Sequence, residues 1–277
     1  MKVSVITVVF NLFQAKRNKT FLQTLESVHH QTYSDIEHII IDGGSTDGTV
    51  DLLKEYAQKG WIKYVSEPDK GIYDAMNKGV KLCCGSIVTF LNSDDFFHNP
   101  KAIELSVKAL SKGYDFSYAP IINLDEKKKM QKVGKIKLGR LLRNMPFPHP
   151  GMFVIKDVFQ KIGGFDTNFR LMGDYDFILR LYLHNYRGTM VNKTLATFRR
   201  GGATDQNEKQ HPSEKIYLYR KNYAEFCPTA DFEKMAQTYI FPFKLLKALY
   251  QCPSPEIKRS CLWIGLNSLK RKLFGKI

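Results

Sequence analysis

Strand-like and helix-like segments alternate through the first hundred residues, and this alternation restricts the fold more than any other feature of the sequence. Short runs rich in β-branched and apolar residues cover positions 3–10, 36–41, 61–65 and 86–91. The helical patterns between them cover positions 19–31, 46–58 and 73–82. Ser45 or Thr46 is the expected cap of the second helix. Such alternation predicts an α/β fold with a central, mostly parallel sheet and flanking crossover helices.

The pattern becomes mixed after Pro100. A helix to about residue 110 precedes an expected strand at 114–122, a short helix at 174–183 and a strand at 189–198. No internal repeat or low-complexity linker divides the sequence, so we expect one compact unit with a second, mixed α+β half and a C-terminal appendage. The expected boundaries give residues 1–99, 100–230 and 231–277.

The net charge of +15 is concentrated in two segments. Eight Lys or Arg and no acidic residue lie between Lys127 and Arg143, and nine basic residues accompany Glu256 alone from Lys234 to the end. The second segment also carries leucines at helical spacing, at positions 262, 266, 269 and 273. A basic amphipathic helix of this kind either packs against its own domain or lies on an anionic membrane surface.

The cysteines and the apolar runs indicate in which cellular compartment the protein works. Five cysteines without a C-x-x-C pair disfavour a disulfide framework or a zinc site and indicate a reducing environment. The apolar run at 3–10 is too short to span a bilayer, and no other stretch approaches the required length. We therefore expect a cytoplasmic protein that is soluble or peripherally bound to a membrane.

Acidic turns follow the second, third and fourth expected strands. They are Asp42-Gly43-Gly44, Glu67-Pro68-Asp69 and Asn92-Ser93-Asp94-Asp95. Because the carboxyl ends of parallel strands meet at one edge of a sheet, these side chains should gather where α/β proteins bind ligands. Each turn alone is also explained by ordinary turn or helix-cap chemistry. Together they indicate a site for Mg²⁺ or Mn²⁺, in which one or two Asp suffice because phosphate and water complete the coordination.

The two glycines after Asp42 match neither the dinucleotide-binding spacing nor the phosphate-loop spacing. We expect them to form a tight strand-to-helix turn that leaves the Asp42 carboxylate free at the sheet edge. A carboxylate in that place accepts a hydrogen bond from an N–H donor such as a uracil imide.

Five stretches of the sequence, in order, resemble the family-two glycosyltransferases of the GT-A fold, over a length from Val3 to about Leu183. They are residues 7–11, 42–49, 66–77, 92–95 and 173–176 with Arg180. The run SEPDKGIYDAMNKG followed by FLNSDD is similar to bacterial enzymes that build capsule, exopolysaccharide or O-antigen. The resemblance implies a nucleotide-sugar-binding half at 1–99 and an acceptor-binding half at 100–230.

The resemblance also implies roles for individual residues. The nucleotide-sugar pocket would contain Thr7, Asn11, Asp42, Asp69, Lys70, Asn92 and Ser93. The metal ion would be held by Asp94 and Asp95. The general base would be Asp174, and the acceptor side would contain His149 and Asp176. For His149 a hydrogen bond to a backbone carbonyl is an equal explanation.

The sequence departs from the family pattern at two positions. Asn92 stands where the first Asp of the D-x-D motif is usual, and an amide there can still contact a ribose or a metal-bound water. Gly173 stands where a Glu usually precedes the base. The base assignment therefore rests on Asp174, with Asp176 as the alternative.

The resemblance, together with the basic segments, implies an inverting, metal-dependent glycosyltransferase that uses a UDP-sugar and a glycan or polyprenyl-diphosphate-linked acceptor, at the inner face of the cell membrane. One alternative is a sugar nucleotidyltransferase, which would need a Gly-rich basic loop after the first strand, whereas residues 7–18 contain no Gly. The other is a non-catalytic nucleic-acid-binding protein, which would interleave aromatic and basic residues. The basic runs are nearly free of aromatic residues until Phe147, so no nucleic-acid partner is expected.

Overall fold

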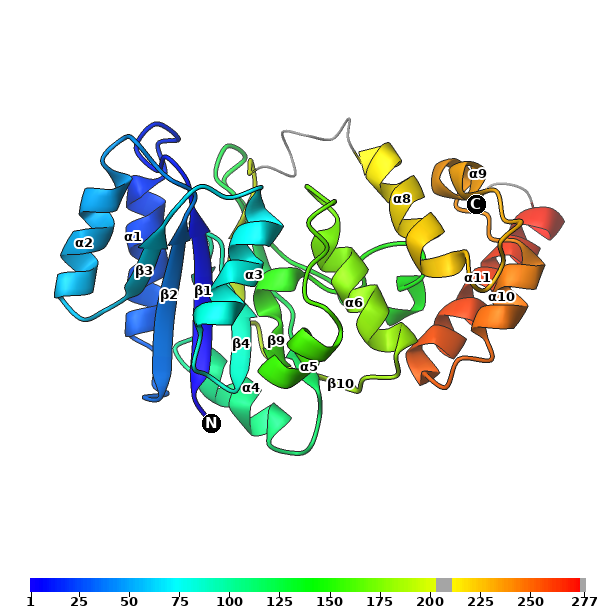
Figure 1. Cartoon of the computed structure of the whole chain (residues 1–277). Helices are drawn as coiled ribbons and strands as arrows, with labels where there is room; N and C mark the ends of the chain where they lie inside the picture. The colour runs from blue at the N-terminus through cyan, green and yellow to red at the C-terminus, as the bar shows by residue number, and fades with distance from the viewer. Residues whose placement is uncertain (203–210, 275–277) are drawn as a thin grey trace.

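A seven-stranded sheet with helices on both faces forms the centre of the molecule (Figure 1). The computed structural model describes residues 1–202 and 211–274. The strands lie in the order β10-β6-β9-β4-β1-β2-β3. Their bounds are β1 Val3–Val9, β2 Ile36–Asp42, β3 Lys63–Ser66, β4 Ile87–Phe90, β6 Phe116–Tyr118, β9 Phe153–Ile155 and β10 Gly188–Met190. Neighbours pair in parallel except β9, which is antiparallel to β4 and β6. The predicted mostly parallel α/β sheet is confirmed.

Alternate residues of β2 show how the first helices cover this sheet. The side chain of Ile40 packs with Phe21 and Leu53, which belong to α1 (Asn18–His29) and α2 (Thr49–Gln58). The neighbouring Ile39 and Ile41 pack on the opposite face with Met76 and Val80 of α3 (Ile72–Leu82). This period of two is the pattern of a strand that is buried on both faces.

The second helix begins three residues later than the sequence indicated. Gly48 precedes Thr49 with a left-handed φ of 90°, and no side chain caps the helix, so the expected cap at Ser45 or Thr46 is wrong. Asp47 instead accepts hydrogen bonds from the backbone N–H and the hydroxyl of Thr49. The segment 43–48 is therefore a loop above the carboxyl edge of the sheet.

A smaller four-stranded sheet, in the order β5-β11-β7-β8, adjoins this edge. Its strands are β5 Phe96–Phe97, β7 Ile122–Asp125, β8 Met130–Val133 and β11 Ala196–Arg199. The expected single strands at 114–122 and 189–198 are each divided between the two sheets. Between β6 and β7 the strand is interrupted at Pro120, which has no N–H to donate to a ladder. The division brings Arg199 next to the turn that follows β4.

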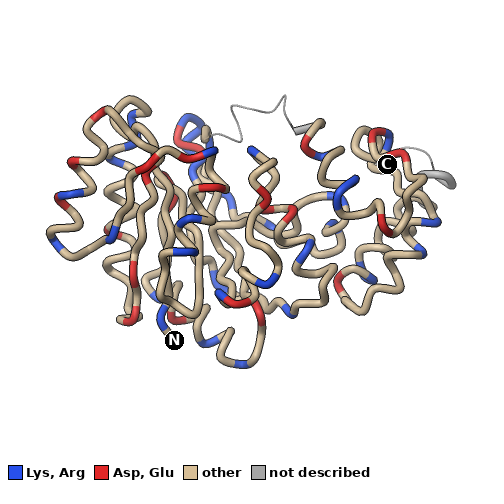
Figure 2. The backbone as a smooth tube through the Cα atoms, in the orientation of Figure 1, with Lys and Arg blue, Asp and Glu red and all other residues tan. Residues whose placement is uncertain are grey.

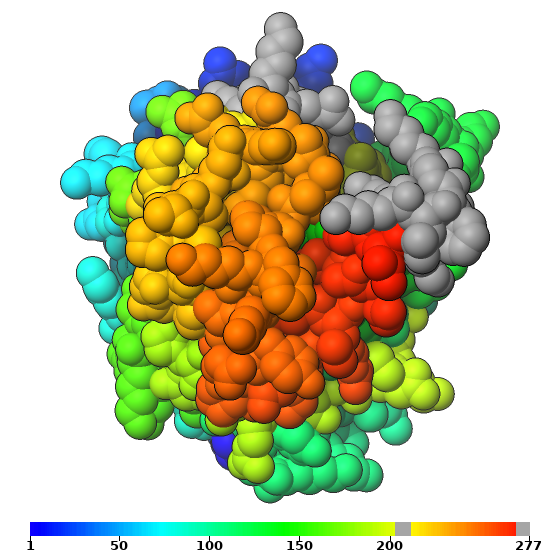
Figure 3. Space-filling model, turned by 90° about the vertical axis from the view of Figure 1, so that its right-hand side faces the viewer, coloured from blue at the N-terminus to red at the C-terminus, as the bar shows by residue number. Residues whose placement is uncertain are grey.

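The helices α8 to α11 pack together at the end of the molecule away from α2, as Figure 3 shows, whereas α4 and α5 lie along the central sheet. The bounds of these helices and of α6 are α4 Ala102–Leu110, α5 Lys156–Lys161, α6 Gly173–Leu183, α8 His211–Tyr223, α9 Phe232–Thr238, α10 Phe243–Leu249 and α11 Pro255–Phe274. No helix within the described ranges combines the length and apolarity that a bilayer crossing requires.

One face of α11 packs against the protein and another face is open to solvent. Ile257 and Ile264 are fully buried in the main core, and Trp263 contacts the 3₁₀ helix Leu138–Arg140. In contrast, Leu262, Leu266 and Leu269 are 55%, 60% and 55% exposed. The predicted row of leucines is thus solvent-facing as far as it is described, since the side chain of Leu273 lies outside the described residues.

A buried ion network joins α6 to α8 through Asp176. Its carboxylate is fully buried and accepts hydrogen bonds from Arg180 Nε at 2.8 Å, Lys221 Nζ at 3.0 Å and Asn222 Nδ2 at 2.8 Å. Residues two apart on a helix point about 200° apart, so Asp176 faces away from the side that Asp174 faces. The structure therefore does not bring Asp176 to the acceptor side, where the sequence placed it.

We expect Asp176→Asn to destabilise the protein by roughly 3–5 kcal/mol, because an amide removes the buried negative charge that pairs with Arg180 and leaves Lys221 with Asp166 alone. Urea unfolding measures this loss. The matched control is Asp51→Asn, whose side chain is 80% exposed and pairs with Lys54 on the surface of α2; it should change stability by no more than about 0.5 kcal/mol. If Asp176→Asn lost activity but kept the stability of the wild type, Asp176 would instead be assigned to the acceptor side, as the sequence indicated.

Candidate active site

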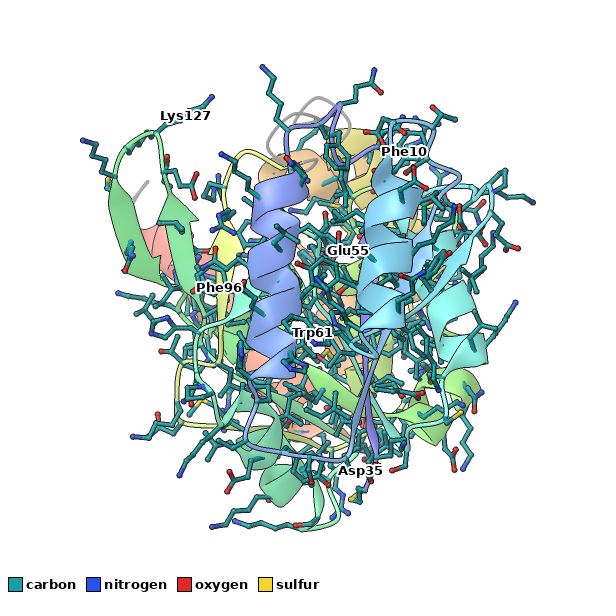
Figure 4. All side chains as sticks on the ribbon, turned by 90° about the vertical axis from the view of Figure 1, so that its left-hand side faces the viewer. Phe10, Asp35, Glu55, Trp61, Phe96 and Lys127 are labelled. Carbon is teal, nitrogen blue, oxygen red and sulfur yellow. The ribbon has the colours of Figure 1, made fainter. Side chains whose placement is uncertain are left out.

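A cavity of about 750 Å³ opens at the carboxyl edge of the central sheet. Figure 4 shows this edge at the top, marked by Phe10, while Asp35 marks the opposite edge. The walls of the cavity come from the end of β1, the turn before α3, the segment 92–94 after β4, and the segment 198–202 at the end of β11. The cavity therefore lies where parallel strands of an α/β sheet present ligand-binding groups.

Asp94 is the carboxylate of the acidic turn that faces this cavity. It is mostly buried, and its Oδ2 lies 3.1 Å from Nη1 of Arg17, which also lines the cavity. Burial raises the pKa of Asp94 and Arg17 opposes that rise. Ser93 is buried beside it in the same wall.

Asp95 points away from the cavity, contrary to the expectation that it would be a second metal ligand. Its carboxylate is fully buried and accepts hydrogen bonds from the backbone N–H of Arg199 at 2.9 Å and from Nδ2 of Asn92 at 3.2 Å. Burial, and then the charge of Asp94, raise the pKa of Asp95 well above its usual range. Asp95 thus anchors β11 to the turn after β4.

The residues at this turn suit a hard cation. Within the part of the chain that the structure describes, the Oδ1 atom of Asn92 is buried without a hydrogen-bond partner, and Asn92 lines the cavity together with Asp94. An amide oxygen and a carboxylate are oxygen ligands of the type that Mg²⁺ and Mn²⁺ prefer. The described residues contain no group of three or more His, Cys, Asp or Glu that would hold a metal alone. Phosphate and water oxygens would have to complete the coordination.

Two arginines that the sequence did not identify as functional stand at the same turn. Arg17 pairs with Asp94, and Arg199 donates from Nη1 to the backbone carbonyl of Asp94 at 2.6 Å and from Nε to Glu126 at 2.8 Å. Both line the large cavity. Guanidinium groups recognise phosphate oxygens, so they suit a diphosphate in this cavity. The only sequence signal for Arg199 was a polar loop with two glycines, at 199–202.

The structure brings only part of the predicted nucleotide pocket to the cavity. Asp69 lines it, and its Oδ1 accepts a hydrogen bond from the N–H of Gly71 at 2.8 Å. Thr7 is fully buried away from it, with its hydroxyl 2.9 Å from Nε2 of His38, whose pKa burial lowers to about 3. Lys70 is exposed and is not among the residues that line the cavity.

Asp42 and Asn11 are not among the residues that line the cavity. Asp42 is fully buried and accepts hydrogen bonds from both the N–H and the hydroxyl of Ser45, and from the hydroxyl of Ser66 at 2.6 Å. The expectation of a free carboxylate is therefore wrong. Asn11 accepts from the N–H of Thr46 at 3.0 Å, and its own N–H donates to Ser45. Together they fix the 43–48 loop against the end of β1.

A second cavity of about 280 Å³ adjoins the first, and the two share Ile72, Asn92 and Phe198. Asp174 and His149, which come from distant parts of the sequence, both line it. His149 is buried with its ring against Phe90, at 5.5 Å between centroids. Burial lowers the pKa of His149 to about 4, so its imidazole is neutral at pH 7.

Asp174 lies in the first turn of α6 with one carboxylate oxygen held by the protein. Its Oδ1 accepts from the N–H of Tyr175 at 2.8 Å and from the hydroxyl of Tyr73 at 3.4 Å. Burial raises the pKa of Asp174 to about 6, although both hydrogen bonds act in the opposite direction. A carboxyl with this pKa is a competent proton acceptor near neutral pH. Tyr73 is a further contact that the sequence analysis did not identify.

Comparisons with known proteins agree with this geometry. A family profile described as glycosyl transferase family 2 matches residues 4–163. An uncharacterized glycosyltransferase of Mycobacterium tuberculosis is 37% identical over 188 residues, which cover 65% of this chain and 69% of the relative. The chondroitin synthase of Escherichia coli is 32% identical over 171 residues, which cover 59% of this chain and 25% of that protein.

Two solved structures share the fold at low sequence identity. Residues 1–349 of Staphylococcus aureus TarS, in complex with UDP-GlcNAc, are 16% identical with a TM-score of 0.68, and the match covers 97% of this chain and 92% of the other. A mannosyltransferase of Pyrobaculum calidifontis, in complex with GDP-Man and Mn²⁺, is 17% identical with a TM-score of 0.58. This match covers 99% of this chain and 88% of the mannosyltransferase. Because the family profile matches more than half of the 277 residues of this chain, the chain belongs to glycosyl transferase family 2.

Proposed function

We propose that this glycosyltransferase transfers a sugar from a UDP-sugar to a hydroxyl of a glycan or polyprenyl-diphosphate-linked acceptor, with inversion at the anomeric carbon. The observation that carries the proposal is the arrangement of two adjoining cavities. Asp174 lies in the smaller one, Asp94 lies in the larger one, and Asn92 lines both. In this proposal residues 1–99 form most of the donor site, and residues 100–230 form the acceptor side.

The larger cavity takes the donor. Asn92 and Asp94 would hold Mg²⁺ or Mn²⁺, which neutralises charge on the departing diphosphate when bound. Arg17 and Arg199 offer charge-assisted hydrogen bonds to the same phosphates. Asp69 and Ser93 line the remaining wall and are assigned to the nucleotide. The UDP-GlcNAc complex of a structural neighbour supports a uridine nucleotide, and the GDP-Man complex makes guanosine the competing choice.

The smaller cavity takes the acceptor and supplies the base. Asp174 removes the proton of the acceptor hydroxyl while that oxygen forms a bond to the anomeric carbon. The bond between the anomeric carbon and the diphosphate oxygen breaks at the same time, and the nucleoside diphosphate leaves with the electron pair. His149, which lines this cavity and is neutral at pH 7, is assigned a hydrogen bond to the acceptor, where it would not compete for the acceptor's proton. Attack from the side opposite to the leaving group gives inversion.

We expect Asp174→Asn to lower the transfer rate by roughly 10²- to 10⁴-fold, because an amide cannot take the proton. Wild-type kcat/KM should rise with pH through about 6, since only the ionised Asp174 is a base. Nucleoside diphosphate release measures both effects, and calorimetry should show donor binding preserved in the variant. A rate that stays flat from pH 5 to 7, or an active variant, would move the base to another residue.

UDP should stabilise the protein against heat only when Mg²⁺ or Mn²⁺ is present, because Asp94 would hold the cation whose charge offsets that of the diphosphate. Asp94→Asn should lower UDP affinity by at least about tenfold, whereas Asp51→Asn on the surface of α2 should not change it. Thermal shift with and without EDTA gives the result. A shift with random oligonucleotide instead of UDP would favour the nucleic-acid-binding alternative, and synthesis of a sugar nucleotide from a sugar phosphate would favour the nucleotidyltransferase alternative.

We also propose that the protein works in the cytoplasm and docks on the anionic inner face of the cell membrane. Three exposed leucines of α11 offer an apolar row, and Figure 2 shows Lys and Arg along the neighbouring C-terminal helices. Each basic residue near an anionic surface contributes about 1 kcal/mol. A lipid-linked acceptor would then meet the acceptor cavity at the surface where it is anchored.

Replacing Leu262, Leu266 and Leu269 by Ser should release the protein from vesicles that contain phosphatidylglycerol, because the apolar row is lost while the buried face of α11 is intact. Transfer to a water-soluble acceptor should be unchanged. Leu82→Ser with Met190→Ser is the control, since these side chains are similarly exposed on other elements. Vesicle sedimentation measures binding. Persistent binding by the triple variant would limit α11 to a structural role.

A further inference from the structure

Three consecutive backbone N–H groups before α6 bind one carboxylate from α8. Glu214 accepts a hydrogen bond from Arg170 at 2.9 Å through Oε1, and from Leu171 at 3.0 Å and Met172 at 2.9 Å through Oε2. The donors lie 42 to 44 residues earlier in the sequence. Hydrogen bonds from N–H groups to an ionised carboxylate are stronger than those between neutral groups, so this contact holds the segment firmly.

The segment that Glu214 holds forms one wall of the acceptor cavity. Arg170 and Leu171 line that cavity, and Asp174 follows Met172 by two residues in the first turn of α6. A shift of the segment would therefore move both the cavity wall and the base. Within the part of the chain that the structure describes, the hydrogen bond that Asp174 accepts from a neighbouring helix is the 3.4 Å one from Tyr73 of α3.

We infer that Glu214 is a positioning residue for the transfer reaction, which fixes residues 170–172 and thereby the orientation of Asp174 toward the acceptor hydroxyl. The inference rests on the proposed role of Asp174 as base. Misplacement of a catalytic group by about 1 Å costs up to roughly 10²-fold in rate, so such a contact has a measurable effect.

The charge of Glu214 also acts on Asp174. Burial is the main cause of the raised pKa of Asp174, and the negative charge of Glu214 adds to it. Among the described residues, the other titratable or charged side chains that line this cavity are Tyr73 from α3, His149 and Arg170. Burial raises the pKa of the Tyr73 phenol well above 10 and lowers that of His149 to about 4. Neither of these two titrates between pH 5 and 8.

Two variants of Glu214 distinguish the effect of its negative charge from the effect of its side-chain length. Glu214→Gln keeps the length of the side chain and one accepting oxygen but removes the charge. It should lower kcat by about 10- to 100-fold and move the acidic limb of the pH profile below 6, since removing a negative charge favours the ionised form of Asp174. Glu214→Asp keeps the charge but shortens the side chain, so kcat should fall while the limb stays near 6.

The control is Glu225→Gln, the same substitution at an exposed position just after α8. It should leave kcat, the pH profile and UDP affinity unchanged, and UDP affinity should also be unchanged in both Glu214 variants because the donor cavity is intact. Wild-type kcat and an acidic limb still near 6 in Glu214→Gln would overturn the inference. A joint fall of kcat, UDP affinity and thermal stability, with the limb near 6, would also overturn it by showing a structural role.

Failure of this inference is distinguishable from failure of the proposed base. If wild-type activity has no acidic limb near pH 6, or Asp174→Asn remains active, the base assignment is at fault. If both of those results are as expected and Glu214→Gln behaves like wild type, only the positioning role is excluded.

Discussion

The parallel pairing of β1 with β2 on one side and β4 on the other is the constraint on which the site depends. In this pairing Val9 lies opposite Asp42, and Ile6 lies opposite Phe90. The chain therefore leaves all three strands at the same edge, and the loops that follow meet there. The pairing is stable because both faces of these strands are buried, by α1 and α2 on one side and α3 on the other. A change of register by one residue would exchange the two faces and scatter the loops.

The second half of the chain completes the site because it leaves the central sheet twice. After β6 it passes into β7, and after β10 it passes into β11, which pairs with β5. This route places Phe198 and Arg199 against the turn of Asp94, about a hundred residues earlier in the sequence. The buried Asp95 carboxylate secures the junction through the N–H of Arg199. The two Asp residues of the acidic turn therefore have different roles: Asp94 faces the cavity, and Asp95 holds β11 in place.

Local sequence patterns were sufficient for the first half of the central sheet and for part of the site. The first four strands and the helices between them follow from hydrophobic periodicity, and the acidic turns at their ends follow from the parallel sheet. The patterns could not show which carboxylates are free. Asp42 is satisfied by Ser66, and Asp176 by Lys221 and Asn222, which are 24, 45 and 46 residues away. The sheet switch near Pro120 and the contact of Glu214 with residues 170–172 likewise depend on tertiary packing.

The departure from the family pattern at Gly173 has a physical explanation in the neighbouring helix. A Cβ atom at position 173 would lie 2.7 Å from the ring of Tyr73, so any larger residue there would displace that ring. With glycine in place, Tyr73 packs against the start of α6 and its hydroxyl reaches Asp174. The ring helps to exclude water from the carboxylate, while the hydroxyl favours its ionised form. Burial outweighs the hydrogen bonds, and the pKa of about 6 is the net result of these opposing effects. Asp174 therefore has, without a second acid beside it in the sequence, the proton affinity that its proposed role as base requires.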